Sequence, residues 1–365
     1  MKRLFDYYRQ FEEMTPEEVS AELLARRDEE RAHAVSEVPL LDLSSAAWPG
    51  PPHPEAVNQA TFALRRALNA YPDATPLREA VARAREVAPD RVAVGHGAGE
   101  LLRAALHAIA GGGEVAVAWP SWGPLPRLVH EAGGAPVPVP LARTGAADPD
   151  ALLAAAGDAT RAVALCTPND PTGAVVDEDA LHRLAAALPE RIWLLVDAAL
   201  AEFADPEPRL AALLDRRERV LIMHSGSKAH ALAGLRAGYA LGPPGPLLDR
   251  LAPIHGIAAP AQAALAWAVE AGGNALARRR AAALAERKRL GAALEGSAFS
   301  FAAGVGPLVW LRSADHDAHT IASHLAGRRI KVMPGTAWGD EAHVRLTLRD
   351  PAATDRLVSA LRELG

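Results

Sequence analysis

The sequence predicts an α/β protein in which a large domain with a mostly parallel central sheet is followed by a smaller α+β domain. Two observations predict this fold. Short apolar runs alternate with Ala-rich helical patterns after residue 48, a rhythm typical of strands connected by helices. Several of these runs are apolar without interruption, as expected for strands that helices cover on both faces.

The elements follow in order along the chain. Residues 15–34 are rich in charge and begin with Thr15-Pro16-Glu17-Glu18, a cap, proline and acids that are typical of a helix start. We expect residues 1–45 to form an N-terminal arm that joins the small domain, residues 46–245 the large domain and residues 246–365 the small domain. The strands of the large domain are predicted near residues 91–94, 114–118, 135–139, 161–166, 192–196, 220–223 and 238–241.

The pattern changes in the C-terminal third. Gly242-Pro243-Pro244-Gly245 precedes helices that include an Arg-rich run over residues 275–294. Basic residues interleaved with Ala and Leu are typical of a solvated helix face. Strands are predicted near residues 307–311, 330–333 and 343–348, which completes a smaller α+β domain.

Composition narrows the class of function. The 365 residues carry a formal net charge of −5, which gives no overall basic field for nucleic acid or an anionic membrane. We find no stretch close to the ~20 apolar residues that cross a bilayer, and no signal-peptide core. The single cysteine, Cys166, lies in an apolar run, which indicates core packing. We therefore expect a cytoplasmic enzyme that acts on small molecules.

One lysine indicates covalent chemistry. Only four of the 39 basic residues are lysines, and Lys228 is one of them. Its amine can lose a proton and form a Schiff base with a carbonyl, which a guanidinium cannot do. Ser225 and Ser227 precede it and Arg236 follows it, and hydroxyls with a fork-shaped cation suit a phosphate monoester. This segment therefore predicts a phosphorylated carbonyl ligand.

Further candidate residues follow the apolar runs, because ligands of open α/β sheets gather beyond the carboxyl ends of the strands. Gly95-His96-Gly97-Ala98-Gly99-Glu100 leads into a helix, and its backbone N–H groups can hold a phosphate. Trp122 suits stacking on a flat ring, with core packing as the alternative. Asp197 can hold a ring nitrogen protonated or cap the next helix. The turn from Thr167 to Gly173 adds Asn169 and Asp170.

One ligand meets these requirements: pyridoxal 5′-phosphate (PLP) is planar and carries a phosphate, a ring nitrogen and an aldehyde. From about Leu41 to Thr347 the chain resembles fold-type I, class I/II aminotransferases, and its motifs are most similar to the histidinol-phosphate aminotransferase-like group. The resemblance implies the type I PLP-dependent transferase fold. The motifs that match in order are Tyr71-Pro72-Asp73, Pro120-Ser121-Trp122, Pro168 to Gly173, Asp197, Ser225 to Gly238 and Val344-Arg345-Leu346-Thr347.

The resemblance implies the catalytic roles. Lys228 would form the internal aldimine and then move the substrate proton, and Asp197 would pair with the pyridinium nitrogen. Arg345 would bind the α-carboxylate of the substrate through two parallel hydrogen bonds. The implied reaction moves an amino group between an L-amino acid, or an amino-phosphate, and a 2-oxo acid.

The resemblance also implies which residues bind the cofactor. Trp122 takes the place of the usual stacking tyrosine, and Tyr71 would reach the phosphate from the neighbouring subunit of a homodimer. The other residues expected to bind PLP are Ala98, Gly99, Asn169, Asp170, Asp197, Ser225, Ser227, Lys228 and Arg236.

Three positions depart from the family pattern. The residue before Pro171-Thr172-Gly173 is usually an asparagine that donates to the phenolic oxygen of PLP, and here it is Asp170. Leu200 replaces a tyrosine donor to the same oxygen, and Gly99 stands where aspartate is common. Loss of donors favours the protonated oxygen, so the internal aldimine should titrate at higher pH, unless Asn169 or a protonated Asp170 substitutes. The substrate is therefore not carried over from the family.

Three alternatives stay open at this point. Decarboxylation, cyclisation or oxidation of an amino acid is possible on the same PLP fold. An NAD-dependent dehydrogenase would require an acid where the chain has Trp119-Pro120-Ser121-Trp122. A non-catalytic PLP-binding module would hold the cofactor without turnover.

Histidines and acids elsewhere predict no further site. His224, His230 and His255 lie near the expected pocket, and we interpret each as a packing residue. The cluster from Asp315 to His319 has the residue types of metal ligands, but it fits the start of a solvated helix. No metal site is therefore predicted.

Overall fold

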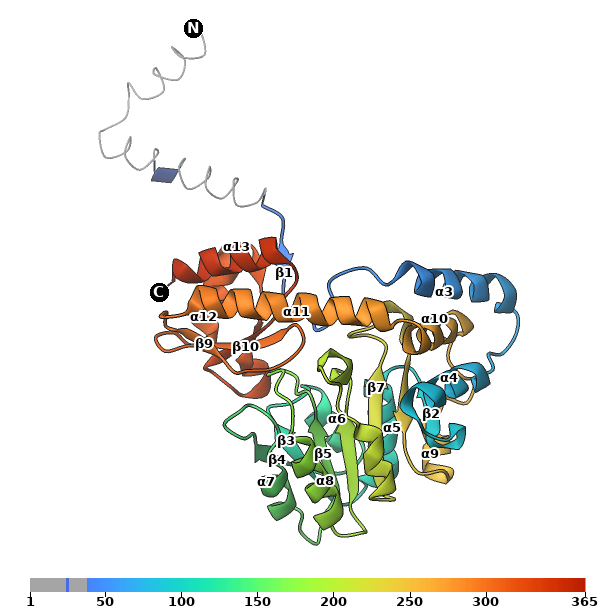
Figure 1. The fold of residues 1–365 in the computed structure, drawn as a ribbon. Coiled ribbons are helices and arrows are strands. Elements are labelled where there is room, and N and C mark those ends of the chain that lie inside the picture. Colours follow the sequence, from blue (N-terminus) through green and yellow to red (C-terminus); the bar gives the residue numbers. More distant parts are fainter. Residues whose placement is uncertain (1–23, 26–37, 365) are drawn as a thin grey trace.

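The larger part of the molecule is built on a seven-stranded sheet. The computed structural model describes residues 24–25 and 38–364, so most of the helix expected over residues 15–34 lies outside the described residues. The strands have the order β2-β8-β7-β6-β5-β3-β4 (Figure 1). They are β2 (Val92–Gly95), β3 (Glu114–Trp119), β4 (Ala135–Pro140), β5 (Thr160–Cys166), β6 (Trp193–Asp197), β7 (Val220–Ser225) and β8 (Gly238–Leu241).

The predicted mostly parallel sheet is confirmed. Five neighbouring strands from β7 to β4 pair in parallel, whereas β8 runs antiparallel to both β7 and β2. Successive side chains of a strand point to opposite faces. Leu194 and Val196 of β6 accordingly enter one apolar core, and Leu195 between them enters another. This is why the strands are apolar without alternation.

Helices cover both faces of this sheet (Figure 1). On one face lie α5 (Ala98–Ile109), α6 (Leu125–Glu131) and α9 (Pro246–Leu251). On the other lie α3 (Pro54–Ala67), α4 (Thr75–Arg85), α7 (Pro149–Ala154), α8 (Glu178–Ala187) and α10 (Ala259–Glu270). Short 3-10 helices span Pro89–Arg91, Ala201–Phe203, Leu210–Asp215, Ala233–Leu235 and Gly335–Trp338.

The smaller part has its own sheet and core. Its antiparallel strands have the order β12-β13-β10-β9, and β1 pairs in parallel with β11. The strands are β1 (Leu41–Asp42), β9 (Phe299–Phe301), β10 (Leu308–Ser313), β11 (Ile330–Lys331), β12 (Met333–Pro334) and β13 (His343–Thr347). The helices are α11 (Gly273–Leu294), α12 (Ala318–Gly327) and α13 (Pro351–Arg362).

Local details of the smaller part agree with the sequence only in part. The run predicted near residues 330–333 is divided into β11 and β12, which join different sheets. The three-residue strand β9 was not predicted, since so short a run carries no clear periodicity. Asp317 caps α12 by accepting a hydrogen bond from the Thr320 N–H at 2.7 Å, which confirms the helix start within the cluster from Asp315 to His319.

The packing suggests where the two parts divide. Leu248 of α9 and Leu265 of α10 belong to the cores of the large sheet. Leu41 and Leu43 belong to the core of the smaller part. The long helix α11 extends from the smaller part toward α10 (Figure 1). We therefore propose that the division lies near the start of α11 rather than at residue 246.

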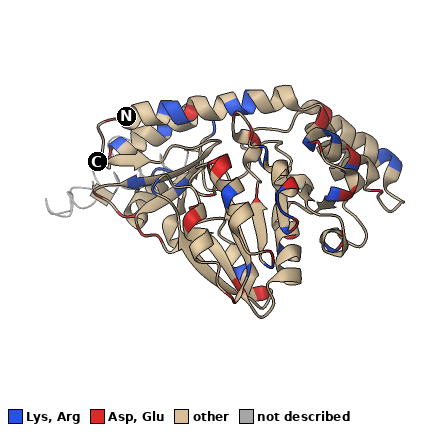
Figure 2. Cartoon of the chain, turned by 60° about the horizontal axis from the view of Figure 1, so that its bottom comes forward, with Lys and Arg blue, Asp and Glu red and all other residues tan. Residues whose placement is uncertain are grey.

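The surface charge is mixed. Figure 2 shows Lys and Arg interspersed with Asp and Glu along the described elements. None of the helices within the described residues is both long enough and apolar enough to span a bilayer.

Candidate active site

A cavity of about 150 Å³ lies at the carboxyl ends of the parallel strands. Parallel strands bring the residues that follow them to one edge of the sheet. Cys166 ends β5, Asp197 ends β6 and Ser225 ends β7, and all three line the cavity. Nine of the predicted site residues line it: Ala98, Gly99, Trp122, Asp170, Asp197, Ser225, Ser227, Lys228 and Arg236.

One corner of this cavity is suited to a phosphate. The first turn of α5 follows Gly97, whose φ of 96° is a left-handed conformation that glycine adopts without strain. Arg236 lies beside this turn and donates to the Ser227 hydroxyl at 3.0 Å and to the His96 carbonyl at 3.4 Å. The Ser225 hydroxyl accepts from the Ser227 N–H at 3.1 Å. Backbone donors of a helix N-terminus, hydroxyls and a guanidinium therefore converge there.

Trp122 forms a wall of the cavity close to α5. A Cβ added at Gly99 would lie 2.8 Å from a ring carbon of Trp122, so only glycine allows the ring to approach this closely. The same ring packs against the apolar core below α5 and α6. The ring also lines the cavity. Core packing, the alternative interpretation, therefore describes part of its environment, and stacking on the cofactor stays a prediction.

Lys228 and Asp197 also line the cavity. The Lys228 ammonium donates to the Ala46 carbonyl at 3.0 Å, and the Asp197 carboxylate accepts from the Ala199 N–H at 2.9 Å. Burial lowers the pKa of Lys228, an effect that Asp170 opposes. Burial raises the pKa of Asp197, which the Ala199 hydrogen bond opposes. Each group is thereby shifted toward its neutral form.

These side chains fit PLP. An amine that burial shifts toward its neutral form can react with an aldehyde. A carboxyl group whose pKa burial raises is kept ionised by a cationic partner, and a protonated ring nitrogen is such a partner. The phosphate corner supplies the remaining contacts. Three of the residues expected to bind the cofactor are exceptions: Asn169 and Tyr71 do not line the cavity, and Asp170 is a carboxylate paired with Arg345 instead of an amide donor. The other residues are chemically matched to PLP.

Asn169 does not line the cavity. Its amide donates to the Pro120 carbonyl at 3.1 Å and to the Thr172 hydroxyl at 3.2 Å, and its oxygen accepts from the Ser121 hydroxyl at 3.1 Å. These hydrogen bonds occupy the polar atoms of the side chain and stabilise the turn between β5 and α8. Asn169 therefore has a structural position, and Asp170 is the residue of the pair that lines the cavity.

Tyr71 also lies outside the cavity of its own chain. Its side chain is 83% exposed and its ring stacks on that of His255, with 5.2 Å between ring centroids.

The interpretation of the three histidines as packing residues is confirmed for two of them. His224 and His230 are buried, whereas His255 is exposed, so the interpretation is wrong for His255.

Arg345 is buried beside the cavity and is already paired. It donates to the Asp170 carboxylate at 3.1 Å and to the Ser44 carbonyl at 2.6 Å. Trp338 lies against its guanidinium, 5.2 Å from ring centroid to Cζ. The carbonyls of Ser44 and Ala46 were not anticipated as neighbours of Arg345 and Lys228. No sequence signal identifies them, because every residue carries a backbone carbonyl.

Cys166 lines the cavity but retains the character of a core residue. Burial raises its pKa well above the ordinary value of 9.0, and the nearby Asp197 adds to the shift. A thiol that stays protonated is a poor nucleophile. The interpretation of Cys166 as a packing residue therefore agrees with its environment.

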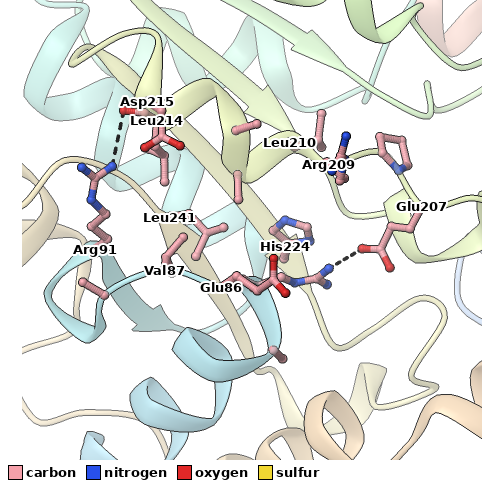
Figure 3. Close-up of a pocket in the computed structure, with 16 residues that line it drawn as sticks. Glu86, Val87, Arg91, Glu207, Arg209, Leu210, Leu214, Asp215, His224 and Leu241 are labelled. Atoms are coloured by element: carbon pink, nitrogen blue, oxygen red, sulfur yellow. Dashed lines mark hydrogen bonds and ion pairs between the residues drawn. The ribbon is translucent and has the colours of Figure 1, made fainter.

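A second cluster of buried charge adjoins this region. Glu202, only 1% exposed, accepts from Arg85 at 2.9 Å and lies 3.1 Å from Nδ1 of His224. Arg85 also pairs with Glu207, and Figure 3 shows Glu207 and His224 at a neighbouring cavity of about 500 Å³. Glu202 was not predicted from the sequence, although a lone acid within the apolar segment 198–204 was a usable signal. Glu202, Glu207 and His224 are close enough for a metal, but Arg85 pairs with both carboxylates and Arg280 supplies a second cation to Glu207.

Replacing Glu202 with glutamine should destabilise the fold in a pH-dependent way. Burial alone would raise the pKa of Glu202, but His224, Arg85 and His230 outweigh it and lower the pKa from 4.5 to about 2. A carboxyl with a lowered pKa stabilises the fold above its unfolded-state pKa, and this stabilisation is lost as the pH falls through about 2. At neutral pH we expect Glu202→Gln to lower the unfolding free energy by about 3 kcal/mol.

Urea unfolding at about pH 7 and about pH 3 measures this effect. The difference between wild type and Glu202→Gln should shrink at the lower pH. Glu100→Gln removes an exposed carboxylate that pairs with Arg103 at 2.8 Å and should change little. A constant difference at both pH values would contradict the ionised state assigned to Glu202.

Comparisons with known proteins agree with this geometry. The family model for aminotransferase class I and II matches residues 38–361. The aromatic amino acid aminotransferase of Mycolicibacterium paratuberculosis is 35% identical over 308 residues, which cover 81% of this chain and 85% of the relative. That of Cutibacterium acnes is 33% identical over 328 residues, covering 88% and 91%.

Solved structures share the fold. The histidinol-phosphate aminotransferase of Sinorhizobium meliloti, determined in complex with PLP, superposes with a TM-score of 0.81 at 24% identity, over 92% of this chain and 95% of that one. The N-succinyldiaminopimelate aminotransferase of Mycobacterium tuberculosis has a TM-score of 0.81 at 25% identity, over 92% and 96%. The chain therefore belongs to the class I and II aminotransferase family and is a PLP-dependent transaminase with the type I fold.

Proposed function

We propose that this aminotransferase takes its amino group from aromatic L-amino acids and passes it to a 2-oxo acid. The names of the relatives at 33% and 35% identity support this substrate class. The cavity is compatible with it, since Trp122, Pro168 and Leu200 form apolar parts of its wall. The catalytic assignment depends on one observation: Lys228, Asp197 and Arg236 all line the same cavity.

Each residue of the site would have a separate role in the reaction. When bound, PLP supplies an aldehyde carbon and a ring that withdraws electrons from the substrate. Lys228, which burial shifts toward the neutral amine, would accept the proton from the substrate α-carbon. Asp197 would accept a hydrogen bond from the protonated ring nitrogen. Ser225, Ser227 and Arg236, with the first turn of α5, would bind the phosphate.

Arg345 would orient the substrate. Its Nε has no hydrogen-bond partner among the described residues although the atom is buried, and a guanidinium can bind a carboxylate with two donors at once. Such a contact holds the α-carbon in one place and so favours proton transfer to a single base.

Single-turnover absorbance measurements test the substrate class. We expect the aldehyde form of the cofactor to convert to its amine form on mixing the enzyme with L-phenylalanine, with phenylpyruvate released in equal amount. L-Aspartate and histidinol phosphate serve as comparison donors and should react at least about tenfold less efficiently, since a pocket's contacts with a side chain discriminate by about 1–3 kcal/mol. Preference for either comparison donor, or no conversion with any donor, would contradict the proposal.

We also infer that the active unit is a cytoplasmic homodimer in which Tyr71 of a second copy reaches the phosphate. The exposure of Tyr71, outside the cavity of its own chain, supports the shared arrangement. The single cysteine allows a reducing compartment. Sedimentation equilibrium should give twice the chain mass of 38.4 kDa, and a monomer with full activity would refute the shared site.

A further inference from the structure

Two neighbouring arginines of α11 point into the molecule instead of into solvent. The Arg-rich run was predicted to be a solvated helix face, and Arg278 is exposed as predicted, but Arg279 and Arg280 are only partly exposed. The same helix places Leu290 and Leu294 in the core of the smaller part. The prediction therefore holds for Arg278 but not for the two arginines that follow it.

Arg279 connects two backbone segments. Its Nη1 donates to the Ala229 carbonyl at 2.8 Å and its Nη2 donates to the Pro51 carbonyl at 3.3 Å. Ala229 directly follows Lys228. Pro51 lies in the segment that leads to α3 from Ala46, whose carbonyl accepts from the Lys228 amine at 3.0 Å. One guanidinium therefore binds both the loop that carries Lys228 and the segment that Lys228 contacts.

The loop that carries Lys228 depends on such a contact. Ala229 is fully buried, and a buried carbonyl without a donor is costly. Two residues later, Ala231 has a φ of 60°, in the left-handed region that few non-glycine residues adopt. A conformation of this kind persists only where neighbouring contacts fix it. Loss of the Arg279 hydrogen bond should therefore loosen this loop locally.

Arg280 holds α11 at the position that Arg279 needs. Its Nε donates to the Glu202 carbonyl, and its Nη2 lies 3.3 Å from Glu207 Oε2. Both acids follow β6 in the larger part of the molecule. Because α11 is bound there by Arg280, the guanidinium of Arg279 is offered to the Ala229 carbonyl from a fixed point on the helix.

We propose that Arg279 is a positioning residue, which fixes the peptide after Lys228 and thereby directs the Lys228 amine at the α-carbon of the substrate. The inference rests on the proposed function in one respect, the role of Lys228 as the base that accepts the α-proton. Arg279 does not line the cavity, so it acts through the backbone of the Lys228 loop. This contact is the same whether the Lys228 amine is free or bound to the cofactor.

Hydrogen exchange of the PLP-loaded full chain, read by mass spectrometry, measures the positioning directly. Arg279→Ala should raise the exchange rate of the peptide covering residues 226–236 by at least about tenfold, because loss of a hydrogen bond from a charged donor shifts a local opening equilibrium by that factor or more. The N–H groups concerned include that of Ala231, which donates to the Lys228 carbonyl at 3.0 Å. Peptides that cover β3 and β4 should exchange as in wild type.

Kinetics with L-phenylalanine separate positioning from binding. Arg279→Ala should lower kcat about a hundredfold, the cost expected when a reacting group is displaced by about 1 Å. KM should change little, because Arg345 keeps its place. Deuterium at the α-carbon should slow the variant more than wild type, because transfer of that proton becomes the slow step. Ethylguanidinium, which has the shape of the side chain removed, should restore part of kcat, whereas sodium chloride at equal concentration should not.

Two further variants complete the test. Arg278→Ala removes an exposed guanidinium one residue away and should match wild type in every measurement. Arg279→Lys keeps the charge but loses the planar pair of donors. It should show a smaller change in the same peptide, and it keeps the test decisive if Arg279→Ala does not fold.

Three outcomes would overturn the inference. Exchange of residues 226–236 that is equal in wild type and both Arg279 variants would show that the contact does not fix the loop. Exchange raised evenly over the whole chain would assign Arg279 a purely structural role. A borohydride label on a lysine other than Lys228 in wild type would remove the role of Lys228 and this inference with it. Failure of wild type to use L-phenylalanine, with the local change in exchange intact, would instead remove only the proposed substrate class.

Discussion

Replacing Lys228 with alanine is expected to lower kcat by about ten-thousandfold and to leave the fold intact. A positioned general base contributes up to about 10⁴ to the rate, and Lys228 is the amine that lines the cavity. Burial lowers the pKa of Lys228, so its charge does not stabilise the folded state at neutral pH. The unfolding free energy of the apoprotein should therefore not fall.

Turnover assays and thermal unfolding measure the two parts of this prediction. Lys288→Ala is the matched control, because Lys288 is an exposed lysine on α11. Reduction of the holoenzyme with borohydride, followed by peptide mapping, should place the phosphopyridoxyl label on Lys228. A label on Lys288 or Lys331, or a Lys228→Ala variant within tenfold of wild-type activity, would contradict the assignment.

Replacing Asp197 with alanine should lower kcat by about a thousandfold. Asp197 is a buried carboxyl at the end of β6, and removal of one partner from a buried ion pair costs about 3–5 kcal/mol. The ring nitrogen of PLP would lose that partner and with it the proton that makes the ring a good acceptor of electrons. Affinity for PLP should also fall.

The stability of the apoprotein, unlike the activity, should not fall when Asp197 is replaced by a neutral residue of the same shape. Because burial raises the pKa of Asp197 above 3.8, its ionised form destabilises the folded state at pH values above the unfolded-state pKa. Asp197→Asn should therefore match or exceed the wild-type unfolding free energy at neutral pH, with an advantage that grows as the pH rises from about 3.8 to the folded-state pKa and is constant above it. A large loss of stability in that variant would contradict the burial argument.

Chemical rescue separates the electronic role of Asp197 from a structural one. A cofactor analogue methylated at the ring nitrogen carries a permanent positive charge and needs no proton there. It should restore part of the activity of Asp197→Ala but none of that of Lys228→Ala. If activity of Asp197→Ala stayed unchanged with the analogue, the residue would act mainly through packing.

Much of the site could be predicted because its residues follow strands directly. Asp197 and Ser225 each end an apolar run, and the order of runs indicated a parallel sheet. Parallel strands bring their carboxyl ends to one edge, so local position in the sequence was enough to group these residues. Trp122 follows β3 closely in the same way, whereas its close approach to Gly99 depends on the packing of α5 and could not be predicted.

Neighbours within one turn were harder to separate. Asn169 and Asp170 were both expected to bind the cofactor, but Asn169 holds its own turn and Asp170 lines the cavity. A turn of this kind directs adjacent side chains to different sides, and the direction depends on the backbone conformation. The sequence shows which residue types are present, but not which of the two side chains points into the cavity.

By itself, the sequence determined the α/β class, the positions of most strands along the chain and most of the residues gathered around Lys228, because these depend on periodicity and on positions at strand ends. Only the tertiary structure decided that Asp170 pairs with Arg345 and that Glu202 pairs with Arg85 and His224. These partners come from distant segments of the chain. Their pairing depends on how the elements pack, because a buried charge is stable only beside an opposite charge and the packing decides which opposite charge lies next to it.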